Sequence, residues 1–453
     1  MRPPSARGRS WDPVPFAVLW AGQFASVLGT LMTNFGIVLW AWQRTGQTTP
    51  VAMVEFCSFG AVVVFGPLAG ALCDRWGRLR TLVASNAAAA LLLAGLATAS
   101  ALSSLSTATV YATLVALGIV LAFQYPALLA SVSFLVPQRH YARASGLLSL
   151  AMSVAGVVGP ATATLVLSHG GLSTIFAIDL ATYAFCALAL TAVARRVREP
   201  APDPTAPRRG LRHDVAHGFR YIASRPGLRA LQTLFFLAYF ATMFGVLISP
   251  MVLARSGTDG TAALAAVLGA AGAGGIAGGA VTALWGRRRG HLKVILPGFV
   301  LIGLLGQVPL GASASPAVWM AASFVGAFLY PLVEAANQAL WQSSTPLAEQ
   351  GRIFAARRVL TESAGVTVLL IAGPLADGVF EPGMREPGWL SSAFGWLTGT
   401  GPGSGMAVLL LLSGVLTALA GLWGLTVRAL RDLDRAAPAE EHRPENSMTI
   451  KER

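Results

Sequence analysis

The sequence has little charge and few cysteines. Only 12% of its 453 residues are charged, and 54% are hydrophobic, whereas a soluble domain carries about 25% charged residues. The three cysteines, Cys57, Cys73 and Cys186, lie in or at the ends of apolar segments, which argues against a disulfide framework and against zinc. This composition excludes an ordinary soluble enzyme.

Motifs for catalysis and for cofactor binding are missing as well. The sequence has no phosphate loop, no nucleophile elbow and no metal-ligand cluster, and neither His217 nor His291 has a partner at ligand spacing. We therefore expect no enzyme activity, no cofactor and no metal. The net charge of +13 is compatible with either nucleic acid or a membrane surface, and the position of the charges decides between them.

What the sequence does contain is a series of long apolar runs. A helix that spans a bilayer needs about 20 apolar residues. Twelve runs meet that length: Phe16–Trp42, Val51–Cys73, Thr81–Leu102, Ala108–Phe134, Leu147–Ser168, Thr174–Ala194, Ala230–Leu253, Ala262–Trp285, Val294–Gly311, Ala317–Trp341, Val359–Phe380 and Gly405–Val427. The sequence therefore predicts an all-α membrane protein with twelve transmembrane helices.

The basic residues support this count. If both termini are cytoplasmic, 30 of the 33 Lys and Arg residues fall in segments on the cytoplasmic side. Arg44, Arg255 and Arg385 are the three on the outer side. Such a bias is the positive-inside pattern of membrane proteins, and it explains the basic composition without nucleic acid.

The longest polar stretch divides the apolar runs six and six. We predict a cytoplasmic tail (1–15), a six-helix bundle (16–194), a cytoplasmic linker (195–229), a second six-helix bundle (230–427) and a disordered cytoplasmic tail (428–453). Within the linker, Asp214–Ala223 has the pattern of a short amphipathic helix. Gly70–Arg78 after the second run and Gly279–Arg287 after the eighth are related by an offset of 209, which predicts two pseudo-symmetric halves.

One short motif narrows the family. The loop between the second and third runs reads Gly70-x-Leu72-x-Asp74-Arg75-x-Gly77-Arg78-x-Arg80, and it resembles the loop 2–3 signature of the major facilitator superfamily. The resemblance implies that Asp74 faces the positive end of a neighbouring helix and holds a cytoplasmic gate shut. The candidate gate residues are Gly70, Asp74, Arg75, Gly77, Arg78, Arg80 and, in the second half, Arg352.

Further motifs resemble the macrolide-efflux-like branch of drug:proton antiporters, which also contains siderophore exporters. They begin at Leu19-Trp20, Ile178-Asp179, His217-Gly218, Gly351-Arg352 and Gly373-Pro374. The resemblance implies export by a monomer in the cytoplasmic membrane of a bacterium, with protons and membrane lipids as partners besides a small-molecule substrate.

The sequence also departs from that branch. Thr30 follows Gly29 where an acid is frequent, the fourth run has no arginine, and the segment Gly156–Pro160 lacks the trailing glycines of the antiporter motif. Antiport is therefore less firmly indicated than transport.

Five carboxylates lie within the apolar runs: Glu55, Asp179, Glu334, Glu362 and Asp377. Each costs about 2.5–3.5 kcal/mol or more at the centre of a bilayer. We expect Glu334, Asp179 and Glu55 to be the candidates for proton coupling, although Glu334 also fits a hydrogen-bonding or gating role and Asp179 a structural one. Glu55 and Asp377 are close enough to span ends to reach interfacial water, and Glu362 is expected to pair with Arg357, Arg358 or the Asp74 loop.

Aromatic and amide residues on four of the runs predict a large apolar cavity with few polar groups. The candidates for its lining are Phe24, Asn34, Phe35, Gln124, Tyr125, Phe236, Tyr239, Phe240, Phe244, Phe324, Phe328 and Asn337. Such a lining suits a bulky amphipathic molecule. A lipid or lysophospholipid transporter, and a receptor or scaffold without transport, remain as alternative hypotheses.

Overall fold

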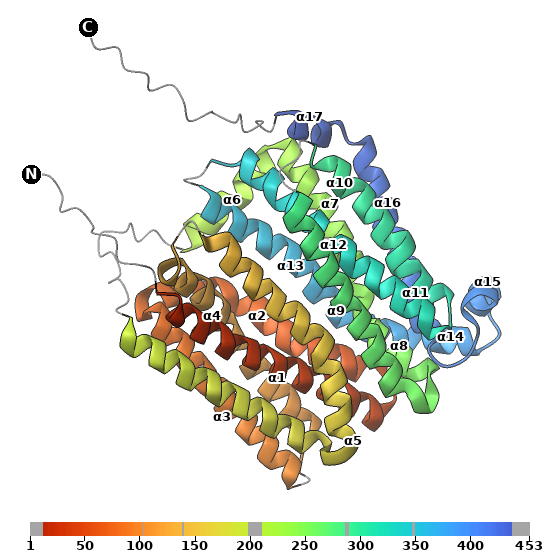
Figure 1. Ribbon diagram of the computed structural model, residues 1–453. Helices are drawn as coiled ribbons and strands as arrows, with labels where there is room; N and C mark the ends of the chain where they lie inside the picture. Colours follow the sequence, from red (N-terminus) through yellow and green to blue (C-terminus); the bar gives the residue numbers. More distant parts are fainter. Residues whose placement is uncertain are drawn as a thin grey trace, which may run out of the picture.

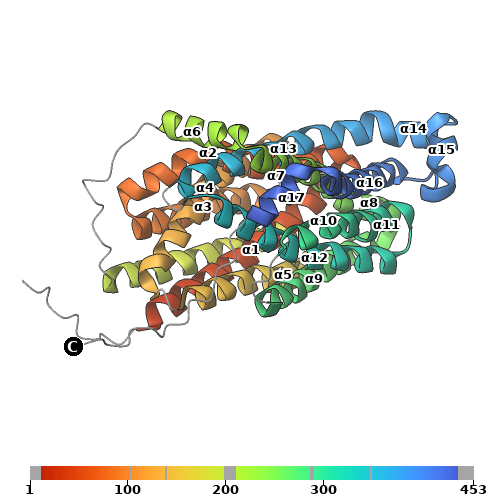
Figure 2. The same ribbon diagram turned by 90° about the horizontal axis from the view of Figure 1, so that it is seen from above.

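The computed structural model describes residues 12–102, 104–137, 140–197, 211–285, 290–346 and 349–436. Within these residues the secondary structure is helical and contains no strand. Eleven helical segments are long and apolar enough to cross a membrane. The first half of the chain, red to yellow in Figure 1, lies beside the second half, green to blue, and Figure 2 shows the same arrangement from above.

The first half contains five helices, one of which makes two crossings. They are α1 (Val14–Thr45), α2 (Thr48–Trp76), α3 (Arg78–Ala101), α4 (Thr107–Leu135) and α5 (Tyr141–Arg196). Helix α5 is interrupted at Gly171, where φ is 68° and ψ is −173°. Its earlier part approaches α1 at Gly159 and its later part runs back along α1 past Gly36 and Gly22, so the eleven segments make the twelve predicted crossings.

The second half begins with the linker helix and includes several interrupted crossings. The helices are α6 (Leu211–Ser224), α7 (Pro226–Thr242), α8 (Ile248–Arg255), α9 (Gly260–Trp285), α10 (Leu292–Leu301), α11 (Val308–Ala312), α12 (Pro316–Ser344), α13 (Gln350–Leu375), α14 (Glu381–Arg385), α15 (Trp389–Thr398), α16 (Ser404–Thr426) and α17 (Arg428–Ala436). Short 3₁₀ turns at Met243–Leu247 and Gly257–Asp259, and π-helical turns at Ile302–Gln307 and Ala376–Phe380, complete them. The predicted ninth span is continuous but passes through the first of these π-helical turns.

The ends of the helices define two faces of the molecule. We call the face with α6, α17 and the start of α1 the linker side, and the face with the end of α1, α14 and α15 the far side (Figure 1). Most contacts between the two halves come from two helix pairs, α2 with α13 and α5 with α9, and α1 also contacts α8. A large apolar cluster that includes Met32, Phe35, Leu247 and Met406 joins the halves on the far side.

Glycines set the closest helix contacts. A Cβ atom at Gly29 would collide with Asp179 and Thr182 of α5, and a Cβ at Gly274 or Gly278 of α9 would collide with the backbone of α12. Small residues at helix crossings let backbones approach closely, which is the main source of packing between helices in lipid.

Two parts of the chain differ from the sequence prediction. Residues 428–436 were expected to be disordered, but they form helix α17, because Leu430 is fully buried and Leu433 packs on the apolar cluster around Ile222 and Leu231. Residues 437–453 lie outside the described residues. Helices α14 and α15 on the far side were not predicted.

We predict that Gly171→Ala destabilises the protein. The backbone at Gly171 lies in a region that is essentially restricted to glycine, and a residue forced into such a conformation costs about 1–3 kcal/mol. The melting temperature in detergent is expected to fall. Gly95→Ala is the control: Gly95 is an exposed helical residue with open space at its Cβ position, so this change is expected to leave the melting temperature equal or higher. Equal melting temperatures for Gly171→Ala and the parent would contradict the prediction.

Candidate functional site

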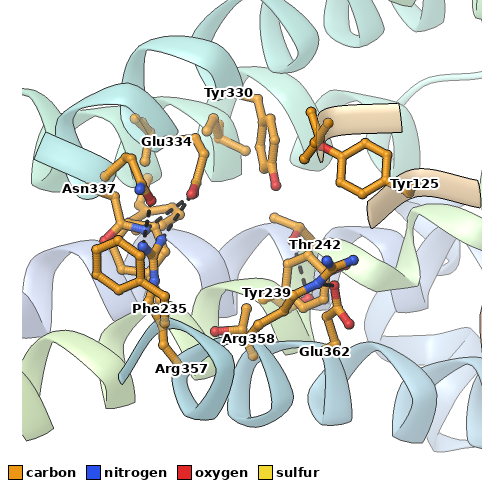
Figure 3. A pocket seen from close by; sticks show the side chains of 17 residues that line it. Tyr125, Phe235, Tyr239, Thr242, Tyr330, Glu334, Asn337, Arg357, Arg358 and Glu362 are labelled. Atoms are coloured by element: carbon orange, nitrogen blue, oxygen red, sulfur yellow. Dashed lines mark hydrogen bonds and ion pairs between the residues drawn. The ribbon is translucent and has the colours of Figure 1, made fainter. Parts of the chain in front are cut away.

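A cavity of about 630 Å³ lies between the two halves. Its walls come from α4, α7, α10, α12 and α13 and from Ile302 in the π-helical turn after α10 (Figure 3). The lining residues of α4, α12 and α13 lie between the middle of each helix and its linker-side end. Apolar side chains form much of the lining: Leu129, Phe235, Phe299, Ile302, Val333 and Phe354. Three tyrosines, Tyr125, Tyr239 and Tyr330, add rings with a polar edge. This lining combines a broad apolar surface with a few polar groups, as small-molecule sites do.

An ion pair between two helices forms one polar region of the cavity. Nη2 of Arg357 on α13 lies 2.9 Å from Oε1 of Glu334 on α12. Arg357 also donates to Oε1 of Gln338 at 2.8 Å, and its guanidinium lies 5.4 Å from the centre of the Trp341 ring. Asn337 donates to the other oxygen of Glu334 at 3.2 Å. Glu334 therefore has a charged partner and an amide partner.

A second ion pair lies within α13 and begins at the residue after Arg357. Nε of Arg358 lies 2.6 Å from Oε1 of Glu362, and the guanidinium of Arg358 lies 5.9 Å from the centre of the Tyr125 ring on α4. The expected pairing of Glu362 with a neighbouring arginine is confirmed. Tyr125 belongs to the first half of the chain, so this region of the cavity includes both halves.

The structure brings some of the predicted lining residues to this cavity. Tyr125, Tyr239 and Asn337 line it together with Glu334. Their role in substrate binding stays a prediction.

The other predicted lining residues lie elsewhere. Phe35, Phe240 and Phe244 pack in or against the far-side apolar cluster. Phe24 stacks on Trp20, and Phe324 stacks on Phe328. Gln124 donates to Asn86. Phe236 is outside the lining, whereas its neighbour Phe235 is part of it. Whether such a side chain reaches the cavity depends on which neighbouring helix covers the face of the helix that carries it.

The other two candidates for proton coupling, Glu55 and Asp179, have neutral hydrogen-bond partners. Oε1 of Glu55 accepts a hydrogen bond from Asn34 at 3.0 Å. Oδ1 of Asp179, whose residue is 1% exposed, accepts one from Thr182 at 3.2 Å. Among the described residues, neither carboxylate lies within ion-pair distance of a basic side chain.

Asp377 joins the two halves on the far side. Its carboxylate accepts the backbone N–H groups of Thr48 and Thr49 at 2.9 and 2.7 Å, and the hydroxyl of Thr49 at 2.7 Å. These are the first residues of α2, whose N–H groups have no partner within their own helix. The expectation that Asp377 reaches interfacial water stays a prediction, and its partner in the structure, the start of α2, was not predicted. The close approach of Gly373 to Thr49 places this carboxylate at the start of α2.

The candidate gate motif is described only in part. The surroundings of Gly70 and the side chains of Asp74 and Arg75 lie outside the described part of the chain. Gly77 has φ 91° and forms the turn between α2 and α3. Arg78 lies 3.5 Å from the carbonyl oxygen of Ala130, to which it donates, and Arg80 is exposed.

Arg352, the gate candidate of the second half, lies where the linker helix packs on α13. Gly218 of α6 approaches the carbonyl of Arg352 closely. Nε2 of His217 lies 3.2 Å from a carboxylate oxygen of Glu349, the residue that precedes α13.

Sequence reasoning missed Arg357 as the partner of Glu334, because it assigned Arg357 to a loop. The helix in fact begins at Gln350. A carboxylate within an apolar span requires a partner, and an arginine near the start of the next span is the signal that identifies one.

Comparisons with known proteins agree on a family. The family model of the Major Facilitator Superfamily matches residues 19–369. Macrolide efflux protein A of Streptococcus pyogenes is 23% identical over 368 residues, which cover 80% of this chain and 90% of that protein. Multidrug efflux pump Tap of Mycobacterium tuberculosis is 24% identical over 449 residues, which cover 94% of this chain and 96% of that protein.

Solved structures show the same fold. A bacterial homolog of the human lysosomal transporter Spinster, in an inward-facing and unoccupied conformation, has a TM-score of 0.63 and 15% identity. The match covers 95% of this chain and 100% of that one. The nucleoside transporter NupG has a TM-score of 0.68 and 12% identity over 90% of this chain and 98% of its own.

We predict that Arg357 stabilises the fold more than Arg358. The Arg357 side chain is 12% exposed and has several partners, so Arg357→Ala removes a largely buried guanidinium with its hydrogen bonds and is expected to cost about 2 kcal/mol. Arg358 is 54% exposed, and Arg358→Ala is expected to cost at most about 1 kcal/mol. Thermal unfolding of both variants in one detergent measures the difference. A larger effect of Arg358→Ala would overturn this ranking.

Proposed function

This chain belongs to the major facilitator superfamily, and from that premise we propose that it exports amphipathic organic molecules in exchange for protons. The observation that carries the proposal is the cavity of about 630 Å³ between the halves, with its aromatic walls and few charged groups. The efflux activities in the names of the two relatives support export of drugs or similar compounds. The cell compartment that fits is the cytoplasmic membrane of a bacterium.

The arrangement of the halves supports alternating access. The cavity lies toward the linker side, whereas Asp377 and the far-side apolar cluster join the halves on the opposite side. The positive-inside bias favours a cytoplasmic linker side with both termini there. In that orientation the cavity is accessible from the cytoplasm, and rocking of the halves about it would expose it outside.

Glu55 is the coupling residue that this arrangement favours. Glu55 lies on α2 between Thr49, which contacts Gly373 of α13, and Phe59, which contacts Gly365. It therefore lies on the stretch of helix that must separate from α13 when the far side opens. A carboxylate without a basic partner can exchange a proton when its access alternates between the two sides. Asp179, by contrast, lies between α1 and α5 within one half.

Efflux from whole cells tests the function. We expect cells that contain the protein to accumulate less ethidium and to tolerate more macrolide than cells without it, and we expect a proton uncoupler to abolish both effects. Unchanged accumulation and tolerance would contradict drug export. A change in lysophospholipid flux alone would favour the lipid-transport hypothesis instead.

Proton coupling is tested with Glu55→Gln. The glutamine side chain has nearly the same shape and keeps an acceptor oxygen, but it cannot bind and release a proton. Uphill efflux is therefore expected to be lost, while equilibration of the dye down its gradient in vesicles continues. The matched control is Asp179→Asn, which is expected to retain uphill efflux because its hydrogen bond from Thr182 can persist. Loss of uphill efflux in the control, with retention in Glu55→Gln, would transfer the coupling role to Asp179.

The far-side contact is tested with Asp377→Asn. An amide presents only one acceptor oxygen to the start of α2 and no charge, and loss of a helix cap costs about 1 kcal/mol. The far side is therefore expected to open about fivefold more often. The readout is the labelling rate of a cysteine that replaces the buried Ala372, measured with an impermeant maleimide in a background without Cys57, Cys73 and Cys186.

Glu381→Gln is the matched control for Asp377→Asn. Glu381 also caps a helix on the far side, since it accepts the N–H groups of Gly403 and Met406 at 3.2 and 3.1 Å. Both partners belong to its own half of the chain, so this variant is expected to leave the labelling rate unchanged. Equal acceleration by both variants would indicate general loosening, and no acceleration by Asp377→Asn would show that this contact does not hold the halves together.

A further inference from the structure

The two ion pairs in the cavity expose opposite charges. In the pair between Glu334 and Arg357, the Glu334 side chain is 42% exposed and the Arg357 side chain 12%. In the pair between Arg358 and Glu362, the arginine is the open member, at 54% against 19%. One wall of the cavity thus presents a carboxylate and the other a guanidinium (Figure 3).

The partners explain why Arg357 is the recessed member of its pair. Gln338 and the Trp341 ring hold its guanidinium, which leaves Glu334 as the charge toward the open space. Glu334 accepts two hydrogen bonds, from Arg357 and Asn337, whereas a carboxylate has about four lone-pair sites. Glu334 therefore has acceptor capacity left for a cationic group of a ligand.

Arg358 has corresponding donor capacity. Its Nε donates to Glu362, and a guanidinium has five N–H donors. The ring of Tyr125 lies near it. Arginine binds carboxylates and phosphates well because its donors form a planar fork.

The apolar lining makes the two open charged groups, Glu334 and Arg358, selective for the charges of a ligand. In a cavity with walls such as Phe235, Phe299 and Val333, an ionic group of a ligand without a partner loses hydration and gains little in return. A ligand with a cation and an anion on one apolar body satisfies both open groups. A ligand with a cation alone leaves Arg358 without a ligand partner, and a ligand with an anion alone leaves Glu334 without one.

We propose that the preferred substrates are zwitterionic amphiphiles, with the cationic group on Glu334, the anionic group on Arg358 and the apolar body against Phe235 and Phe299. This inference rests on the proposed export function and adds the charge class of its substrates. Purely cationic amphiphiles are then weaker substrates, because they use only Glu334.

The test compares dyes that share a xanthene core. Rhodamine B is a zwitterion, its ethyl ester is a cation and fluorescein is an anion. Binding to the purified full chain in detergent is measured by fluorescence anisotropy. Rhodamine B is expected to bind about tenfold more tightly than its ester, since one hydrogen bond between charged groups contributes about that factor. Fluorescein is expected to bind more weakly than rhodamine B.

Three variants separate the two contacts. Arg358→Gln is expected to weaken rhodamine B to the level of its ester and leave the ester unchanged, and Arg358→Lys is expected to keep part of the preference. Glu334→Gln is expected to weaken both dyes by the same factor. The matched control is Arg428→Gln, an exposed arginine of α17 outside the cavity, which is expected to change neither dye.

The outcomes distinguish this inference from the function on which it rests. If the ester binds as tightly as rhodamine B and Arg358→Gln does not change their ratio, the zwitterion preference is wrong, while efflux of the ester from cells still supports export. If the chain neither binds nor moves any of the three dyes, the export function itself is contradicted, and this inference with it.

Discussion

Hydrocarbon offers no hydrogen-bond partners, so every polar group within a spanning helix must find a partner in the protein. The partners of the acids in this chain follow that rule. Asp377 uses the free N–H groups of α2, Glu55 uses Asn34, and Glu334 uses Arg357. Each of these contacts connects different helices, and the one at Asp377 connects the two halves. The requirement for a partner thus connects these three acids to a second helix, whereas Glu362 pairs with Arg358 of its own helix.

Glycines set close helix contacts both within each half and between the halves. Gly29 and Gly278 do so within a half, and Gly272 and Gly373 do so where α9 meets α5 and where α13 meets α2. Between the halves, the contacts are concentrated on two helix pairs, α2 with α13 and α5 with α9. Movement that keeps each half intact would change these two pairs most, together with the far-side apolar cluster, and a rocking transporter needs such a division.

The sequence predicts more of the fold than of the candidate site. Twelve apolar runs and the distribution of basic residues identify the helices and their alternation, since hydropathy and charge act locally. Cavity residues depend on helix rotation: Phe236, Tyr239, Phe240 and Phe244 were predicted to line the cavity, but of these Tyr239 lines it, beside the unpredicted Phe235. One residue turns the face of a helix by about 100°. Asp377 could not be placed either, because its partners are more than 300 positions earlier.

Helix α13 and the turn after it carry residues of the cavity at one end and of the far-side contact at the other. Arg357, Arg358 and Glu362 lie toward one end, and Gly365, Gly373 and then Asp377 follow toward the other. A helix of 26 residues is about 39 Å long, so a tilt of about 10° displaces one end by about 7 Å relative to the other. A shift of α13 at the arginines is therefore expected to move Asp377, in the turn that directly follows the helix, relative to the start of α2. One helix can in this way link occupancy of the cavity to release of the far-side contact, without a chain of intermediate contacts.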